Sequence, residues 1–303
     1  MSDDVRRHLR TALSRTTARL GEAGIVSSSA ESRILIEAAA RADGPLVMLD
    51  ALPEDFAARL EELVARRERR EPLQLILGRA PFRRLLLATA PGVFIPRPET
   101  ELAIDVLLEH ARSDEVRTVV DLCTGSGALG AAVLDEMPSS RVLALEIDPA
   151  ARDLAARNLA AVDPARGEVR VGDVGDAQLL ADPEAVLGVR AGGVDAVLAN
   201  PPYIPADAIP REQEVREHDP ARSLFGGGAD GLDVPRSVVA LAGRLLRPGG
   251  LLVMEHADVQ GSSTRALAED TGSFIDIRTV RDLTGRDRFL VALRAHPSTP
   301  STR

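Results

Sequence analysis

Near the middle of the chain stands the stretch Val119-Val120-Asp121-Leu122-Cys123-Thr124-Gly125-Ser126-Gly127-Ala128-Leu129-Gly130. Its first four residues have the mainly apolar character of a buried strand, and residues 128–137 have that of a helix. Gly125, Gly127 and Gly130 follow the spacing G-x-G-x-x-G, which allows a tight turn and a close approach of the backbone to a ligand. The stretch therefore predicts a strand, a turn and a helix that together bind a nucleotide-like molecule.

The same alternation of strands and helices continues towards the C-terminus. We expect further strands at residues 142–146, 168–171, 194–199 and 251–255, with helices at 149–161 and 235–246 and a Pro-Gly-Gly turn at 248–250. Two apolar runs, 275–280 and 288–293, flank Thr284-Gly285 and predict a closing hairpin. The fold class is therefore α/β, with a mostly parallel, seven-stranded Rossmann-like sheet that binds its ligand at the C-terminal ends of the strands.

Glu146 ends the second predicted strand, 19 residues after Gly127. An acidic side chain at this position accepts hydrogen bonds from ribose hydroxyls. NAD and S-adenosyl-L-methionine satisfy the pattern equally, because both contain an adenosine. The turn and the acid thus predict a nucleotide-type site without selecting its ligand.

The fourth predicted strand ends in Asn200-Pro201-Pro202-Tyr203, which contains the only tyrosine of the chain. Strand ends are where catalytic groups project in this architecture, and two prolines stiffen the backbone and remove two N–H donors. The side-chain oxygen of Asn200 and the carbonyl of Pro201 are then two acceptors beside a flat aromatic ring. Such a site suits a planar –NH₂ group, because it binds both of its hydrogens.

The region before the α/β pattern reads as a helical domain at residues 1–72, followed by a hairpin linker at 73–95. Ser28 and Glu31 have the spacing of a capping box that opens the second helix, and a helix is expected to begin at Pro53. Apolar runs at 73–77 and 85–89 are expected to form the hairpin. The α/β domain then occupies 96–303.

Composition excludes several classes of protein. The 303 residues include 37 basic and 46 acidic side chains, a net charge of −9, and the scattered arginines form no basic stripe, which argues against a nucleic-acid partner. No apolar run reaches the ~20 residues of a membrane span, and the first ten residues lack the apolar core of a secretory signal. Cys123 is the only cysteine, and the five histidines have no metal-ligand spacing, so we expect no disulfide and no metal site. These features predict a cytoplasmic protein without a membrane partner.

The chain resembles the release factor glutamine methyltransferases, also called the HemK or PrmC family of protein-(glutamine-N5) methyltransferases. The resemblance covers essentially the whole chain. The matching stretches are residues 95–101 (IPRPETE), 123–127 (CTGSG), 200–204 (NPPYI), 225–233 (FGGGADGLD) and 283–288 (LTGRDR). It implies a class I methyltransferase domain at 96–303, preceded by the helical domain, which would recognise the substrate.

The resemblance also implies roles for individual residues. The methionine part of S-adenosyl-L-methionine would be wrapped by Cys123, Thr124, Gly125, Ser126 and Gly127. Glu146 would hold the ribose hydroxyls, and Asp173 would lie near the adenine. Asn200, which also borders the methyl donor, would grip the substrate amide together with Pro201, while Pro202 and Tyr203 would shape the slot.

Three positions depart from the common family pattern. Cys123 stands where a glycine is frequent, Glu146 where an aspartate is frequent, and Val174 where some members carry an aromatic residue. The first narrows the approach of the backbone to the ligand, and the third removes aromatic stacking on the adenine.

The implied reaction is transfer of a methyl group to the amide N5 of the glutamine in the Gly-Gly-Gln loop of class I peptide chain release factors, with S-adenosyl-L-homocysteine as the product. Two alternatives stay open. Asn-Pro-Pro-Tyr also occurs in enzymes that methylate adenine N6, so a nucleic acid is the second candidate substrate, although the charge of −9 argues against it. The third reading is a non-catalytic module that only binds S-adenosyl-L-methionine. The presence of the complete motif Asn200–Tyr203 argues against it, because a binding module would not need to hold a substrate amide.

Overall fold

The computed structural model describes residues 3–42, 44–112, 115–210 and 212–296. The chain divides into two compact units. One comprises Met1–Arg79 together with Pro210–His218, and the other comprises Ala80–Ile209 and Asp219–Arg303. The outer ends of the predicted domains, residues 1–2 and 297–303, lie outside the described residues.

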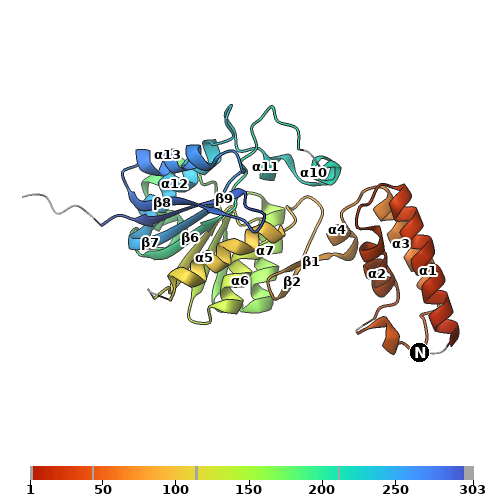
Figure 1. Cartoon of the computed structure of the whole chain (residues 1–303). Coiled ribbons are helices and arrows are strands. Elements are labelled where there is room, and N and C mark those ends of the chain that lie inside the picture. Colours follow the sequence, from red (N-terminus) through yellow and green to blue (C-terminus); the bar gives the residue numbers. More distant parts are fainter. Residues whose placement is uncertain (1–2, 43, 113–114, 211, 297–303) are drawn as a thin grey trace, which may run out of the picture. The chain divides into compact units, whose positions relative to one another are not determined.

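A seven-stranded sheet forms the centre of the larger unit, in the order β5-β4-β3-β6-β7-β9-β8 (Figure 1). The first five strands in this order are parallel, and β9 pairs antiparallel with both β7 and β8. The strands are β3 (Thr118–Leu122), β4 (Arg141–Glu146), β5 (Gly167–Val171), β6 (Val194–Ala199), β7 (Leu246–Glu255), β8 (Phe274–Arg281) and β9 (Asp287–Arg294). The predicted fold class, with its C-terminal antiparallel hairpin, is confirmed.

Helices cover both faces of this sheet (Figure 1). On one face, α5 (Leu102–His110) and α6 (Ala128–Glu136) pack on the odd-numbered side of β3, which includes Val119. On the other, α8 (Ala177–Ala181), α9 (Pro183–Leu187), α12 (Asp233–Leu245) and α13 (Gly261–Asp270) pack on the side that includes Val120. The strands read as continuous apolar runs because both of their faces are buried.

Two further helices complete the larger unit. α7 (Pro149–Val162) begins at Asp148, whose side chain accepts hydrogen bonds from the N–H groups of Ala150 and Ala151. A short helix, α11 (Ala221–Leu224), lies in the loop between β6 and α12. Within the described ranges, no helix is long and apolar enough to span a membrane.

The smaller unit consists of helices around its own apolar core. They are α1 (Asp3–Glu22), α2 (Ser28–Ala39), the 3₁₀ turn η1 (Leu46–Met48), α3 (Phe56–Glu68), α4 (Leu73–Leu77) and, far along the chain, α10 (Gln213–His218). Buried Arg67 of α3 donates to Glu31 of α2 and to Glu214 of α10, and Arg70 also donates to Glu214. These charge-assisted bonds explain why a segment of the α/β sequence packs with the helices.

Three local predictions are wrong. Residues 73–77 form α4 rather than a hairpin arm, since Gly78, in the left-handed conformation, ends a helical turn there; the hairpin pairs β1 (Arg79–Phe82) with β2 (Leu85–Ala88). The N-cap of α2 is Ser27, which makes no side-chain capping bond but donates to Glu31. Residues 248–250 lie inside β7, where the pairing with β6 shifts register, rather than in a turn before it.

Candidate active site

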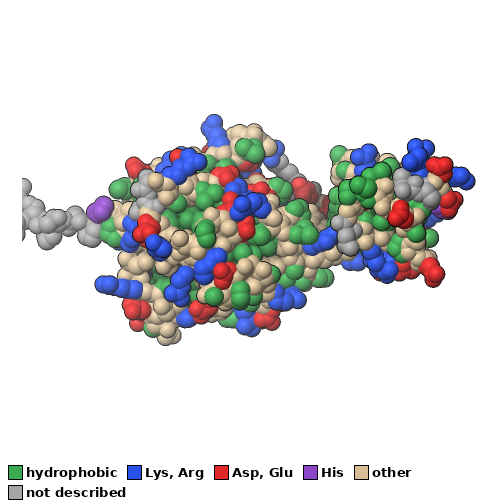
Figure 2. Space-filling model, turned by 90° about the horizontal axis from the view of Figure 1, so that it is seen from below, with side chains coloured by type: hydrophobic (Ala, Val, Ile, Leu, Met, Phe, Trp, Pro, Cys, Tyr) green, Lys and Arg blue, Asp and Glu red, His purple; other side chains and the backbone are tan. Residues whose placement is uncertain are grey.

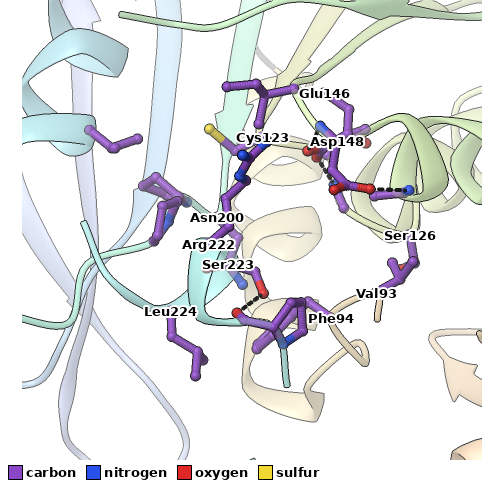
Figure 3. A pocket seen from close by; sticks show the side chains of 18 of the residues that line it. Val93, Phe94, Cys123, Ser126, Glu146, Asp148, Asn200, Arg222, Ser223 and Leu224 are labelled. Carbon is purple, nitrogen blue, oxygen red and sulfur yellow. Dashed lines mark hydrogen bonds between the residues drawn. The ribbon is translucent and has the colours of Figure 1, made fainter. Parts of the chain in front are cut away.

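A cavity of about 370 Å³ lies at the C-terminal ends of β3, β4 and β6. Figure 3 shows Glu146, Asp148 and Ser126 gathered on one side of it, Leu224, Ser223 and Phe94 on another, and Cys123 and Asn200 between them. Of the residues predicted for the site, those that line the cavity are Cys123, Thr124, Gly125, Ser126, Glu146, Asp173, Asn200, Pro201, Pro202 and Tyr203. The sheet thus brings the turn at residues 123–126 and the motif at residues 200–203 to one cavity.

Gly127, the remaining predicted residue, supports the turn from behind. Its φ is +82°, and an added Cβ would lie 2.7 Å from Leu159 Cδ1 and 3.0 Å from the Cα of Ala155. Only glycine therefore lets α6 and α7 approach so closely. At Gly125, with φ +57°, a Cβ would meet no atom within 4 Å, so that this glycine leaves its backbone open to the cavity.

Cys123 also has a left-handed backbone, with φ +57°. Any residue with a side chain is strained in this conformation, whereas glycine is not. A cysteine at position 123 therefore costs backbone strain that a glycine would avoid. Burial raises the pKa of its thiol well above the ordinary value. This shift favours the protonated thiol over the thiolate, which is the nucleophilic form.

Glu146 projects from the end of β4 and is buried. Its Oε2 accepts a hydrogen bond from the Gly125 N–H at 2.8 Å, and its Oε1 accepts from the Asp148 N–H at 2.9 Å. Burial raises the pKa of the carboxyl group, while these backbone donors oppose the shift. Each carboxylate oxygen keeps a second lone pair, so the group can also accept from two ribose hydroxyls.

Asp121 is a site residue that the sequence reasoning missed. It is fully buried at the end of β3 and lines the cavity. Its Oδ2 accepts from the Thr124 hydroxyl and from the Gly130 N–H, while its Oδ1 has no hydrogen-bond partner among the described residues. Burial raises the pKa of this carboxyl group to about 7. The available signal was an acidic residue inside an otherwise apolar strand.

Asp173 follows β5 at the rim of the cavity, where it is exposed and accepts from the Gly175 N–H at 2.8 Å. Its neighbour Val174 is buried, and both Val174 and Ile147 line the cavity. The part of the cavity wall beside Asp173 is therefore aliphatic, because a valine occupies position 174.

Asn200 connects to two residues outside the predicted motif. Its Nδ2 donates to Thr100 Oγ1 at 3.1 Å, and the Thr100 hydroxyl donates to Glu255 Oε2 at 2.7 Å. Tyr203 donates from its hydroxyl to Glu255 Oε1 at 3.3 Å. Thr100 belongs to the 3₁₀ turn η2 (Pro98–Glu101), and Glu255 ends β7. No local pattern in the sequence indicated this contact, because it joins residues 155 apart in sequence.

Another part of the wall comes from two loops distant in sequence. Phe94 and Arg97 line the cavity together with Arg222, Ser223 and Leu224. Arg97 lies 4.9 Å from the centre of the Phe94 ring and donates to Asp219 Oδ2 at 2.5 Å. This ion pair connects the loop before α5 to the loop that contains α11.

The hydrogen-bond acceptors and the apolar wall of the cavity fit S-adenosyl-L-methionine. The unpartnered Oδ1 of Asp121 can accept from an ammonium group, and Glu146 can accept from ribose hydroxyls. The aliphatic wall at Val174 suits adenine. No group of three His, Cys, Asp or Glu side chains suited to a metal ion occurs in the described part of the chain.

The chain is similar to two family models and to several known proteins. One family model, described as the PrmC N-terminal domain, matches residues 11–78, and another, described as the methyltransferase small domain, matches residues 84–212. Similar proteins named release factor glutamine methyltransferase occur in Bifidobacterium longum, with 39% identity over 93% of this chain and 98% of that protein, and in Mycolicibacterium smegmatis, with 42% identity over 94% and 98%. Among solved structures, a T. thermophilus 16S rRNA methyltransferase aligns with 71% of this chain and 49% of its own, at a TM-score of 0.47 and 22% identity.

Proposed function

The chain belongs to the release factor glutamine methyltransferase family, and we propose that it transfers a methyl group from S-adenosyl-L-methionine to a glutamine side chain of a release factor. The acceptor atom is N5 of the glutamine in the Gly-Gly-Gln loop of class I peptide chain release factors. S-adenosyl-L-homocysteine is the second product.

The observation that carries this proposal is the orientation of the Asn200 amide. Because Nδ2 donates to Thr100, the other amide atom, Oδ1, is the one available to a ligand. Pro201, which also lines the cavity, contributes a carbonyl oxygen. Two acceptors at one end of the cavity match the two hydrogens of a primary amide.

Holding these hydrogens also explains the reaction. S-adenosyl-L-methionine, when bound, supplies an electrophilic methyl group. An amide nitrogen is a weak nucleophile, and Asn200 and Pro201 fix it in line with the donor, an orienting effect of about 7–11 kcal/mol in favourable cases. The N–C bond forms as the bond between the methyl carbon and the sulfonium sulfur breaks and leaves its electron pair on sulfur. During this step the same oxygens stabilise the positive charge that develops on nitrogen. The nitrogen then loses a proton to water, so that the product is a neutral secondary amide.

The remaining residues bind and enclose the donor. Glu146 holds its ribose, Asp121 its ammonium group, and the turn Cys123–Gly127 surrounds the methionine part. Asp173 and Val174 border the adenine, while Pro202 and Tyr203 close the slot for the glutamine.

The helical unit is proposed to bind the release factor, and the protein to act in the cytoplasm, where release factors work. Residues 1–72 supply most of this recognition domain, 73–95 the linker and 96–303 the catalytic domain. On the face seen in Figure 2, arginine and acidic side chains are interspersed. Together with the net charge of −9, this supports a protein substrate over a polyanionic nucleic acid.

Methyl transfer from labelled S-adenosyl-L-methionine tests the proposal. A class I release factor is compared with its loop variant Gln→Ala and with adenine-containing RNA and DNA, and peptide mass spectrometry locates the label. We expect one methyl group on the loop glutamine and none on the variant. Asn200→Ala should lower kcat/KM by roughly 100- to 1000-fold and leave donor affinity within about twofold. Label on adenine alone would replace the proposal with the nucleic-acid alternative.

A further inference from the structure

The side chains of Asn200, Thr100 and Glu255 form a chain of hydrogen bonds at the edge of the sheet. Met254, next to Glu255, pairs with Ala199, next to Asn200, so that parallel β6 and β7 place both residues at the same edge. Thr100, contributed by η2, lies between them and bonds to each. Thr100 is 4% exposed and Glu255 is 2% exposed, and Glu255 does not line the cavity.

The direction of the bonds in this chain follows from counting hydrogens. An ionised carboxylate can only accept, and a threonine hydroxyl has a single hydrogen. Once Thr100 gives that hydrogen to Glu255, its oxygen can only accept from Asn200, which must then present its NH₂ group. The opposite, flipped amide would place Oδ1 against the Thr100 oxygen with no hydrogen between the two atoms.

We propose that Glu255, acting through Thr100, is the positioning residue that keeps Asn200 Oδ1 directed towards the substrate. This inference rests on the proposed function and adds to it a residue outside the Asn-Pro-Pro-Tyr motif. Glu255 touches no reacting atom. It selects one of two amide orientations that would otherwise have similar shape.

The protonation of Glu255 controls this selection. Burial raises the pKa of Glu255 to about 7, against the opposing effects of the Thr100 hydroxyl and of Arg288 on β9. Glu99 of η2 raises the pKa further, whereas the Tyr203 hydroxyl lowers it. Protonated Glu255 no longer requires the Thr100 hydrogen, which becomes free to donate to a flipped Asn200. Activity should therefore fall as the pH drops through the Glu255 pKa.

Kinetics of four variants test the proposal. Thr100→Val keeps the shape but removes the chain of bonds, and should lower kcat roughly tenfold with donor affinity unchanged. Thr100→Ser restores the hydroxyl and should recover most of kcat. Thr16→Val, at a threonine that is also buried but lies in the core of the helical unit, is the matched control and should stay within about twofold. Glu255→Gln resembles the protonated acid, because its side chain carries a donor as well as an acceptor. It should therefore lower kcat roughly tenfold at every pH and lose the acidic limb of the pH profile.

Nuclear magnetic resonance of the free protein gives a readout that does not depend on activity. The Asn200 side-chain amide signal, identified by its loss in Asn200→Ala, should titrate near pH ~7 in the wild type and not in Glu255→Gln. It should also move in Thr100→Val. A signal that ignores pH and both substitutions, or a Thr100→Val enzyme within twofold of wild type, would overturn the inference. If the signal titrates but no release factor is methylated, the positioning role stands and the proposed function fails.

Discussion

The two left-handed glycines of the turn after β3 should lose different amounts of stability on the same substitution. At Gly127, an added Cβ would meet the backbone Cα of Ala155 at 3.0 Å and Leu159 Cδ1 at 2.7 Å, whereas at Gly125 it would meet nothing within 4 Å. Both positions have positive φ, +82° and +57°. Gly127→Ala and Gly125→Ala therefore share the backbone strain and differ in packing.

The expected magnitudes follow from these distances. A side chain in the left-handed region costs about 1–2 kcal/mol, partly offset by the lower entropy of the unfolded alanine chain, so Gly125→Ala should destabilise by about 1 kcal/mol. At Gly127, overpacking adds about 1–3 kcal/mol, because Leu159 can rotate but the α7 backbone at Ala155 can yield only by moving the helix. Gly127→Ala should therefore destabilise by about 2–4 kcal/mol in total.

Thermal unfolding followed by far-ultraviolet circular dichroism measures the difference, with about 2–4 °C expected for each kcal/mol. Binding of S-adenosyl-L-methionine, measured by calorimetry, should show the reverse order. Gly125 lines the cavity and Gly127 does not, so Gly125→Ala should weaken binding about tenfold although it is the less destabilising substitution. Equal losses of stability in the two variants would refute the packing argument for Gly127.

Three further perturbations test the electrostatics. Glu146→Ala should raise the Kd for S-adenosyl-L-methionine about 10- to 100-fold in calorimetry, because two hydrogen bonds to a charged acceptor are lost. Glu146→Asp should stay within several-fold. An unchanged Kd in Glu146→Ala would refute the binding of the ribose by Glu146. The affinity for S-adenosyl-L-methionine should increase as the pH rises through the Asp121 pKa of about 7, because the ionised carboxylate attracts the ammonium group. Asp121→Asn should flatten this pH profile, and a slope that persists in the variant would show that another group titrates. Glu214→Ala should destabilise the helical unit by about 1–2 kcal/mol, since Glu31 is then the one carboxylate of the described residues still bonded to buried Arg67, beside the Glu71 carbonyl. It should also raise hydrogen exchange in α10, and unchanged exchange would contradict an anchoring role for this ion pair.

The sequence predicted the α/β core accurately because its signals are local. Val119 and Val120 point to opposite faces of β3, and both faces are covered, so the strand is a short continuous apolar run between turn residues. The predictions failed where contacts with distant residues decide the secondary structure. Residues 73–77 are apolar enough for a strand, and only the packing of the helical unit and the left-handed Gly78 make them a helix.

The sequence by itself therefore determined the order of the strands along the chain, the turn at Gly125 and Gly127, and the chemical types at Asn200 and Tyr203. Only the tertiary structure decided that Thr100 and Glu255 meet beside Asn200, that Asp121 lines the cavity and has a buried oxygen with no hydrogen-bond partner among the described residues, and that α10 joins the helical unit. The physical reason is the range of the interactions. Periodicity and turn chemistry act over a few residues, whereas hydrogen bonds between buried groups join residues that the sheet brings together from 100 or more positions apart.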